Sequence, residues 1–285
     1  MGDSLIFDWN KLGDDTTSLP HHIEFDDETL RDGLQSPSVI DPPIEDKLQI
    51  LHLMNGLGID IADLGFPGSG TRAAADVERL AREIVTTRLK IRPACAARTH
   101  RQDIQSIIDI SERAGIPIEV HAFIGSSPIR LYAEDWTLEY LLKVTEDTTS
   151  FAEKHGLPVM YVSEDTTRSD PETISKLFKA AINCGAKRVC VCDTVGFATP
   201  AGVRALINYV RQVVGETGED VKIDWHGHCD RGLGVINAIV AAESGAHRLH
   251  GTALAIGERV GNVQMDLLLV NLRLMGWIDH DLTLL

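Results

Sequence analysis

Residues 221–230 read VKIDWHGHCD, and they join a short apolar stretch to two closely spaced histidines. Residues 221–225 are typical of a short buried strand. His226 and His228 follow, and side chains two positions apart on an extended segment point to the same face. Neutral imidazole is the commonest metal ligand in proteins. The spacing leaves two interpretations open: a metal site, or two hydrogen-bonded polar residues at the end of a strand.

Similar apolar stretches recur along the chain and alternate with longer segments of helical period. Strands are expected at residues 22–25, 60–63, 90–94, 118–123, 159–162, 188–192, 222–225 and 248–251. Amphipathic helices are expected at residues 44–57, 72–86, 101–114, 138–155, 171–184, 200–214, 232–244 and 263–275. Thr199 before Pro200 and Asp170 before Pro171 are typical of helix starts.

Eight strand-then-helix units in about 250 residues predict an α/β protein with one (β/α)8 TIM barrel, spanning residues 1–285. The alternative is an open doubly wound sheet. That fold usually has a glycine-rich turn after its first strand, and residues 25–33, FDDETLRDG, do not form one. The barrel is therefore the preferred prediction.

Composition narrows the functional class. The 285 residues carry 27 basic and 42 acidic side chains, a net charge of -15, which disfavours binding to nucleic acid or to an anionic membrane surface. No apolar run is long enough for a membrane span, and the N-terminal MGDSLIFDWN lacks the pattern of a secretory signal. Five cysteines without a C-x-x-C pair favour the reducing cytoplasm.

In a TIM barrel the active site lies in the loops that follow the strands. Polar residues concentrate at those positions here. They are Asp27, Arg31, Asp32, Asp63, Arg98, His121, Ser126, Ser127, Arg130, Glu164, Asp165, Arg168, Asp193, Thr194, His226, His228, Glu258, Arg259 and Asn262. Loops at the opposite end, such as residues 183–187, look like plain helix caps, so the sequence predicts one functional rim.

Two histidines and a carboxylate at this rim suit a divalent cation with open coordination positions. Asp32 is the expected carboxylate, because the first strand of a closed barrel lies close to the seventh. Asn262 could add a neutral oxygen. The alternative for Asp32 is a helix cap or a salt bridge to Arg31.

Arg31 and Thr194 are candidates for contacts with substrate. A guanidinium stays protonated, so it can stabilise a developing oxyanion but cannot act as a base. The alternative is an arginine that holds Asp27 or Glu164. The Thr194 hydroxyl suits a carboxylate oxygen, and capping of the next helix is the other interpretation.

Several separated motifs resemble the DRE-TIM metallolyase superfamily, which includes isopropylmalate, homocitrate and citramalate synthases and hydroxymethylglutaryl-CoA lyase. The superfamily motifs are DETLRDG (27–33), HGH (226–228) and IGERVGN (256–262). Those similar to isopropylmalate synthases are LGFPGSG (64–70), HAFIGSSPIR (121–130), SEDTTRSD (163–170) and CDTVGFATP (192–200). YAEDW (132–136) is similar to the Y-x-E-D-W of citramalate synthase.

The resemblance implies a divalent metal (Mg, Mn or Zn) held by three ligands with Asn262 nearby. The ligands it implies are Asp32, His226 and His228. It implies that Arg31 and the metal polarise the ketone of a 2-oxo acid, whose carboxylate Thr194 binds.

The resemblance also implies an acyltransferase in which Glu134 helps to deprotonate acetyl-CoA for a Claisen-type condensation, followed by thioester hydrolysis. The pocket for the 2-oxo acid would involve Asp63, Leu64, His121, Tyr132, Arg130 and Glu164. A homodimer is expected.

Three features depart from the synthase pattern. Cys229 follows the second histidine where synthases commonly have asparagine, and DGLQ (32–35) is closer to the lyase. The chain ends soon after the last predicted helix, so we expect that a C-terminal accessory segment is lacking. Arg130 stands where isopropylmalate synthases commonly have histidine. It suggests a second anionic group on the substrate, unless it pairs with Glu134 or Asp135.

Two other functions stay open. One is carbon–carbon cleavage of a hydroxy-acyl-CoA, although GERVGN stands near Gly257 in place of the lyase's cysteine-containing loop. The other is a non-catalytic barrel that binds metal and keto acid. Cys190 and Cys192 share a face of the sixth strand, and packing is favoured over a second metal site there.

Overall fold

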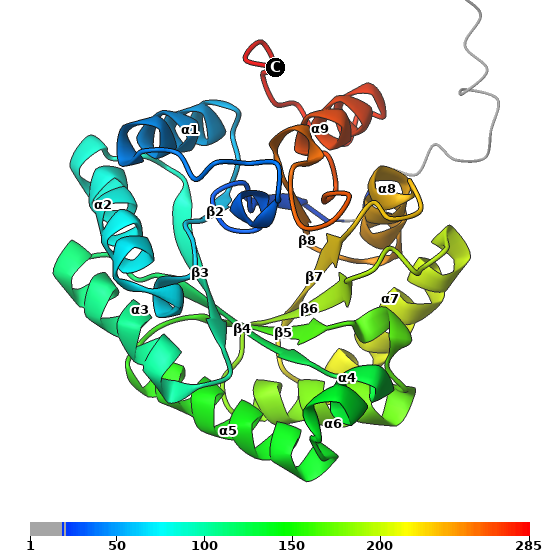
Figure 1. The fold of residues 1–285 in the computed structure, drawn as a ribbon. Helices are drawn as coiled ribbons and strands as arrows, with labels where there is room; N and C mark the ends of the chain where they lie inside the picture. The colour runs from blue at the N-terminus through cyan, green and yellow to red at the C-terminus, as the bar shows by residue number, and fades with distance from the viewer. Residues whose placement is uncertain (1–18, 20) are drawn as a thin grey trace, which may run out of the picture.

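The computed structural model describes residues 19 and 21–285, in which eight parallel strands close into a barrel surrounded by helices (Figure 1). The segment MGDSLIFDWN lies outside the described residues. Each strand pairs with the next along the chain, and β1 closes the barrel against β8. The strands are β1 (Glu24–Asp27), β2 (Ile61–Asp63), β3 (Arg92–Arg98), β4 (Glu119–Gly125), β5 (Val159–Glu164), β6 (Arg188–Asp193), β7 (Lys222–Gly227) and β8 (Arg248–Gly251). The predicted (β/α)8 TIM barrel is confirmed.

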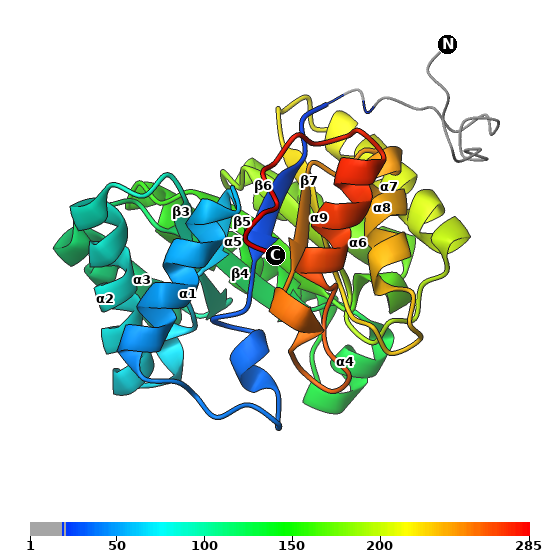
Figure 2. The same cartoon turned by 90° about the horizontal axis from the view of Figure 1, so that it is seen from above.

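Helices cover the outside of the barrel (Figures 1 and 2). They are α1 (Ile44–Gly56), α2 (Thr71–Thr87), α3 (Arg101–Ala114), α4 (Pro128–Glu134), α5 (Leu138–Lys154), α6 (Pro171–Asn183), α7 (Pro200–Gly215), α8 (Gly234–Ser244) and α9 (Met265–Leu274). Short 3-10 turns are η2 (Gly33–Gln35), η3 (Pro67–Ser69), η4 (Thr166–Arg168) and η5 (Ala253–Ala255). Among the described residues, no helix is long and apolar enough to cross a membrane.

The capping residues read from the sequence form the expected hydrogen bonds. The Asp170 side chain accepts from the Thr173 backbone N–H, and the Thr199 side chain accepts from Gly202, each before a proline at the first helical position. Such a cap typically stabilises a helix by about 1 kcal/mol. These signals fix where α6 and α7 begin.

One helix was not predicted. The short α4 follows β4, and in Figure 2 it lies at the same end of the barrel as the loop after β1. Pro128 occupies its first turn, and Arg130 pairs with Glu134 one turn later, with 3.3 Å between nitrogen and oxygen. A segment for which the sequence predicted no helix or strand is thus a short helix at the rim.

The interior of the barrel is partly ionic. Because side chains alternate along a strand, Asp224 on β7 and Arg248 on β8 both point inward. Arg248 is 0% exposed; its Nε lies 2.6 Å from Asp224 Oδ2, and its guanidinium also pairs with Glu119 on β4. Arg188 contacts the same aspartate at 2.8 Å. A buried charge without a partner is strongly unfavourable, so these groups depend on one another.

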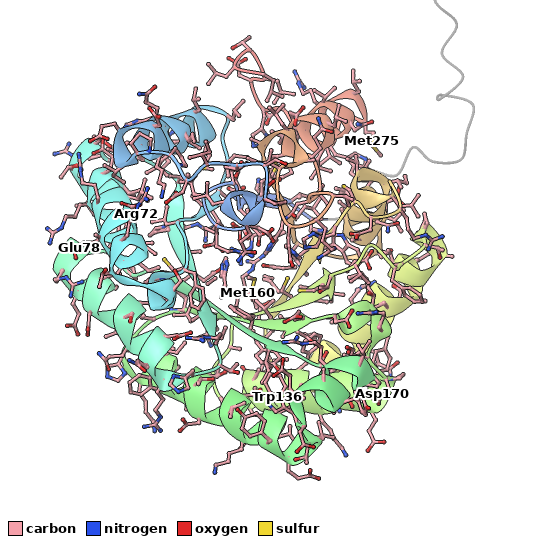
Figure 3. All side chains as sticks on the ribbon, in the orientation of Figure 1. Arg72, Glu78, Trp136, Met160, Asp170 and Met275 are labelled. Carbon is pink, nitrogen blue, oxygen red and sulfur yellow. The ribbon has the colours of Figure 1, made fainter. Side chains whose placement is uncertain are left out.

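A small sulfur-rich cluster fills the space next to this network. Met160 lies in the middle of the barrel, whereas Glu78 and Asp170 lie at its periphery (Figure 3). Cys190 and Cys192 pack against Met160, with their Sγ atoms 3.9 Å apart. The two cysteines therefore contribute to a buried apolar cluster, as the packing interpretation expects.

Two interior histidines lead to a prediction about stability and pH. Burial favours the neutral ring, but Asp26 and neighbouring carboxylates outweigh burial and raise the pKa of His121 to about 9 and that of His250 to about 10. In unfolded chains the histidine pKa is about 6.5. The bound protons therefore stabilise the fold fully below that pH, and this stabilisation is lost as the pH rises through the folded-state pKa values.

We expect the free energy of unfolding to fall between about pH 7 and 10, by roughly 1.4 kcal/mol per pH unit for each of these histidines. Urea unfolding of the metal-free protein at several pH values measures this slope. His121→Asn removes one of the two groups and should make the slope shallower. A free energy that stays constant across this range would contradict the prediction.

Candidate active site

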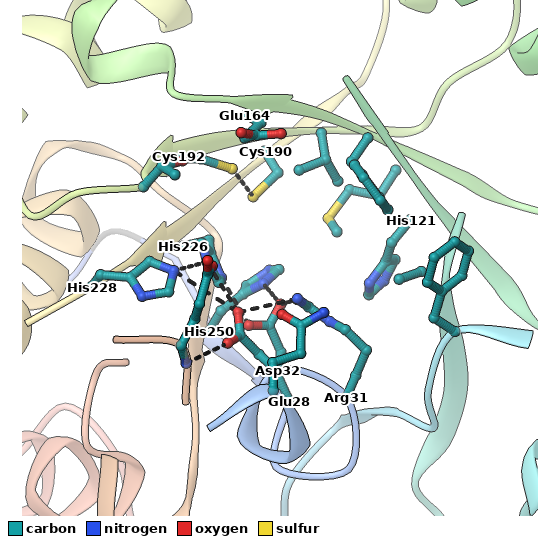
Figure 4. Close-up of a pocket in the computed structure, with 18 residues that line it drawn as sticks. Glu28, Arg31, Asp32, His121, Glu164, Cys190, Cys192, His226, His228 and His250 are labelled. Carbon is teal, nitrogen blue, oxygen red and sulfur yellow. Dashed lines mark hydrogen bonds and ion pairs between the residues drawn. The ribbon is translucent and has the colours of Figure 1, made fainter. Parts of the chain in front are cut away.

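A cavity of about 450 Å³ opens at the end of the barrel where the strands finish (Figure 4). Each of the eight strands, or the loop that follows it, contributes lining residues, whereas α4 contributes none. They are Glu28, Arg31, Asp32, Gln35, Phe66, Ala96, His121, Phe123, Met160, Val162, Glu164, Cys190, Cys192, Thr194, His226, His228, His250 and Glu258. Many of the polar residues predicted at the rim are thus brought to one cavity.

Asp32, His226 and His228 meet on one side of this cavity. The two Nε2 atoms of the histidines are 3.1 Å apart, and Asp32 Oδ2 lies 3.8 Å from that of His226 and 3.9 Å from that of His228. All three side chains are buried. One nitrogen or oxygen from each lies within 4.8 Å of the others, so the three can surround one ion.

Asn262 lies beside these three side chains, although it is not among the residues that line the cavity. A β-bridge joins it to His228, and neither of its amide atoms has a hydrogen-bond partner although the side chain is buried. Gly257 lies against it: a Cβ there would be 2.4 Å from Asn262 Oδ1 and 3.2 Å from Asp32 Oδ1. Glycine at 257 therefore leaves room for the amide beside the carboxylate.

These residues fit a divalent cation. A carboxylate, two imidazoles and an unpartnered amide oxygen are donors that Mg²⁺, Mn²⁺ and Zn²⁺ accept, and three protein ligands leave positions for substrate. The two histidines differ in charge. Burial and the charge of His226 lower the pKa of His228 to about 4, whereas for His226 burial is outweighed by Glu28, which raises its pKa to about 9. His228 is thus neutral and ready to bind, and a metal must displace a proton from His226.

Arg31 lies against the candidate metal ligands and is held by three carboxylates. Its Nε is 3.0 Å from Asp63, one terminal nitrogen is 3.1 Å from Asp32, and the other is 2.9 Å from Glu28. Burial alone would lower its pKa, but these carboxylates raise it well above the usual value. The guanidinium is therefore a fixed cation at the cavity wall, and it holds neither Asp27 nor Glu164.

His121 occupies the opposite wall, and Asp63 lies behind it. His121 lines the cavity, and its Nε2 lies 3.0 Å from Glu119 while its Nδ1 lies 3.6 Å from Asp63. Asp63 is fully buried behind Arg31 and His121. It can act on a ligand through these two cations and does not itself line the cavity.

Thr194 and Glu164 face the cavity from β6 and β5. The Thr194 hydroxyl oxygen accepts the backbone N–H of Asp165 at 2.8 Å, which leaves the hydroxyl proton to donate to a ligand. Burial raises the pKa of Glu164, and Arg130 only partly offsets this. Glu164 is therefore a carboxyl group whose proton affinity is increased at the cavity wall.

Three residues predicted for the site lie on α4, outside the cavity. Tyr132 is 90% exposed. Glu134 pairs with Arg130, whose Nε is also 3.6 Å from Glu164 and whose guanidinium lies 5.9 Å from the Trp136 ring. Arg130 lines a smaller neighbouring cavity, so the pairing with Glu134 considered for the sequence is the one observed.

Two titratable residues, Glu28 and His250, are among the cavity residues that the sequence analysis did not assign to the site. Glu28 and His250 line the cavity, whereas Asp27, which was assigned to the rim, is buried with its carboxylate accepting the Thr29 N–H. A signal was available, because His250 lies two residues after Arg248 on one strand and shares its inward face. The strand ends at Asp27 within the DETLRDG motif. The alternation of side chains along a strand therefore could not show whether residue 27 or residue 28 faces the cavity.

Comparisons with known proteins agree with this geometry. The chain belongs to the HMGL-like family, whose profile matches residues 22–285, in accord with its DRE-TIM metallolyase motifs. Homocitrate synthase AksA of Methanopyrus kandleri is 36% identical over 264 residues, which cover 92% of this chain and 62% of that protein. A 2-isopropylmalate synthase of Staphylococcus epidermidis is 33% identical over 257 residues, covering 87% and 47%. The chain thus spans only part of the length of these relatives.

A solved structure supports the fold independently. Hydroxymethylglutaryl-CoA lyase of Pseudomonas aeruginosa superposes with a TM-score of 0.76 at 18% identity, covering 94% of this chain and 91% of that one. At this identity the likeness concerns the barrel. The sequence relatives are named as synthases, and the structural relative is named as a lyase.

Proposed function

We propose that the protein is a metal-dependent acyltransferase that condenses acetyl-CoA with a 2-oxo acid. The observation that carries the proposal is the meeting of Asp32, His226 and His228 in a cavity that Arg31 and Thr194 also line. The similarity to homocitrate and isopropylmalate synthases favours condensation over cleavage. We also propose a homodimer, which light scattering of the purified protein tests.

The bound divalent metal would supply Lewis-acid polarisation of the ketone oxygen. Arg31 adds a fixed guanidinium at the same wall, where negative charge develops on that oxygen. Thr194 donates its hydroxyl proton to the carboxylate of the 2-oxo acid. These contacts would hold the ketone and the carboxylate of the 2-oxo acid. Its side chain would then point at the part of the cavity wall that these residues do not form.

A carboxylate of the chain must take a proton from the methyl group of acetyl-CoA. The methyl carbon then forms a bond to the ketone carbon, the ketone oxygen becomes a hydroxyl, and water cleaves the thioester to release CoA. The motif resemblance assigns the removal of this proton to Glu134. Glu134 lies outside the cavity and pairs with Arg130. Glu164 lines the cavity and has a raised pKa, so we propose it as the better placed base.

The remaining wall favours an aliphatic side chain on the 2-oxo acid. It is formed by Phe66, Phe123, Met160 and Val162. A second anionic group would have to draw Arg130 away from Glu134 and Glu164, because it pairs with both.

The test is release of CoA thiol from acetyl-CoA with a panel of 2-oxo acids, with and without divalent metal. We expect metal-dependent release, with higher kcat/KM for 2-oxoisovalerate or pyruvate than for 2-oxoglutarate or oxaloacetate. Preference for the dianionic acids, lost in Arg130→Ala, would instead assign Arg130 to the substrate. Acetyl-CoA consumption that no 2-oxo acid stimulates counts against the synthase. Cleavage of hydroxymethylglutaryl-CoA would support the lyase, and metal and keto-acid binding without turnover would support a non-catalytic barrel.

Arg31→Lys is expected to lower kcat on the order of 100-fold, the typical loss for one oxyanion donor. Lysine keeps the charge but lacks the planar fork that contacts Glu28, Asp32 and Asp63 at once. Steady-state kinetics measures the loss, and circular dichroism checks the fold. The matched control is Arg98→Lys, because Arg98 makes a similar bidentate contact with Asp103 away from this cavity. Near-normal kcat in folded Arg31→Lys would show that Arg31 is only structural.

A further inference from the structure

Glu28 is a buried carboxylate that joins the metal ligands to the cation of the site. It lies just after β1 and is 2% exposed. Its Oε2 is 2.8 Å from His226 Nδ1, while its Oε1 is 2.9 Å from Arg31 and 3.0 Å from His250 Nδ1 (Figure 4). One carboxylate thus contacts three cationic or titratable groups at the cavity.

The contact with His226 is the one that concerns the metal. Glu28 Oε2 is fully buried and receives no regular hydrogen bond from a described residue, so the ion pair with His226 is what offsets its burial. The opposite ring nitrogen of His226, Nε2, faces His228 and Asp32. A carboxylate at one nitrogen fixes which nitrogen carries the proton and how the ring is turned.

We propose that Glu28 is a positioning residue, which holds His226 with Nε2 toward the metal position and holds Arg31 beside it. This inference rests on the metal site of the proposed function. Glu28 acts through His226 and Arg31 and need not touch the metal or the substrate.

A second cation bound by Glu28, His226 and His250 is the competing interpretation, since their donor atoms also lie within 4.8 Å of one another. The existing partners of Glu28 and of His250 argue against it. Glu28 Oε1 already binds the Arg31 guanidinium, which would repel a cation at that oxygen. His250 uses Nε2 toward Asp224 at 3.4 Å and Asp26 at 3.7 Å, so its protons are all directed at carboxylates. The arrangement is that of a proton-sharing ion network.

The experiment measures Mn²⁺ binding to the metal-free protein by EPR of free Mn²⁺, without substrate. We expect about one Mn²⁺ per chain in the wild type. Glu28→Gln should weaken the affinity about 10- to 100-fold at unchanged stoichiometry, the range found when an outer partner of a metal-binding histidine is lost. Glu28→Asp retains the charge on a shorter side chain and should give an intermediate value. It also provides a second measurement if the glutamine variant does not fold.

Glu119→Gln is the matched control. Glu119 is also a glutamate inside the barrel, with a side chain that is 12% exposed, and its partners are His121 and Arg248, neither of which is a proposed metal ligand. It should leave the Mn²⁺ affinity within about twofold of the wild type whatever it does to stability.

The outcomes are distinct. Wild-type affinity in a folded Glu28 variant overturns the positioning role while leaving the metal site intact. Two Mn²⁺ ions in the wild type and one in the variants would overturn it in favour of a second cation site. No Mn²⁺ binding by the wild type would remove the metal site of the proposed function, and the role of Glu28 with it.

Discussion

Replacing Arg248 with methionine is expected to lower the free energy of unfolding by about 3–5 kcal/mol, the usual cost of removing one member of a buried ion pair. Arg248 is fully buried and neutralises Asp224 and Glu119, with Asp26 4.0 Å away. These carboxylates would be left in the barrel interior with less positive charge. Methionine fills much of the volume, so the change is mainly one of charge.

Urea unfolding followed by circular dichroism measures the loss. Arg113→Met is the control, because Arg113 pairs with Glu78 at the surface, where a salt bridge contributes at most about 1 kcal/mol. Adding Glu119→Gln to Arg248→Met should recover part of the stability, since one uncompensated carboxylate is then neutral. A loss no larger than that of Arg113→Met would mean that the network is not stabilised by Arg248.

The architecture could be predicted because the barrel repeats one unit. Each unit begins with a short apolar stretch, and two helices, α6 and α7, begin after a capping residue that precedes a proline. The ends of individual strands were predicted less accurately. The third strand was expected to end at residue 94 but continues to Arg98. Its last residues, CAAR, have little strand propensity, and pairing with β4 keeps them extended.

The meeting of Asp32, His226 and His228 was also within reach of the sequence. The i, i+2 spacing brings His226 and His228 together, and barrel closure brings Asp32 to them. The structure around α4 could not be predicted in the same way. The conformation of a short segment between two elements depends on tertiary contacts, and hydrophobic periodicity gives no information about them. Arg130 and Glu134 lie one turn apart on that helix and satisfy each other, which directs Glu134 away from the cavity.

The buried ion pairs inside the barrel were harder still to predict from the sequence. Charged residues inside a barrel break the aliphatic pattern of its strands, and the partners of each charge lie on other strands. Asp224 illustrates this, since Arg188 and Arg248 reach it from β6 and β8. Pairing of this kind follows from strand register, which the sequence alone does not state.

His228→Ala is expected to abolish stoichiometric metal binding. In the proposed metal site the imidazole of His228 is the neutral histidine donor. Its loss leaves Asp32 and a histidine that shares its proton with Glu28. Metal content after gel filtration, determined by elemental analysis, measures the effect. In the wild type the affinity should fall as the pH drops, because a protonated imidazole cannot bind a metal.

His155→Ala is the control for this prediction, because His155 lies on the surface at the end of α5 and contacts the Phe151 carbonyl. It should retain the wild-type metal content. Asn262 cannot replace the missing imidazole, since a neutral amide oxygen is a weak ligand on its own. Full metal content in folded His228→Ala would therefore place the metal elsewhere in the barrel and remove the basis for assigning Arg31 to the same reaction.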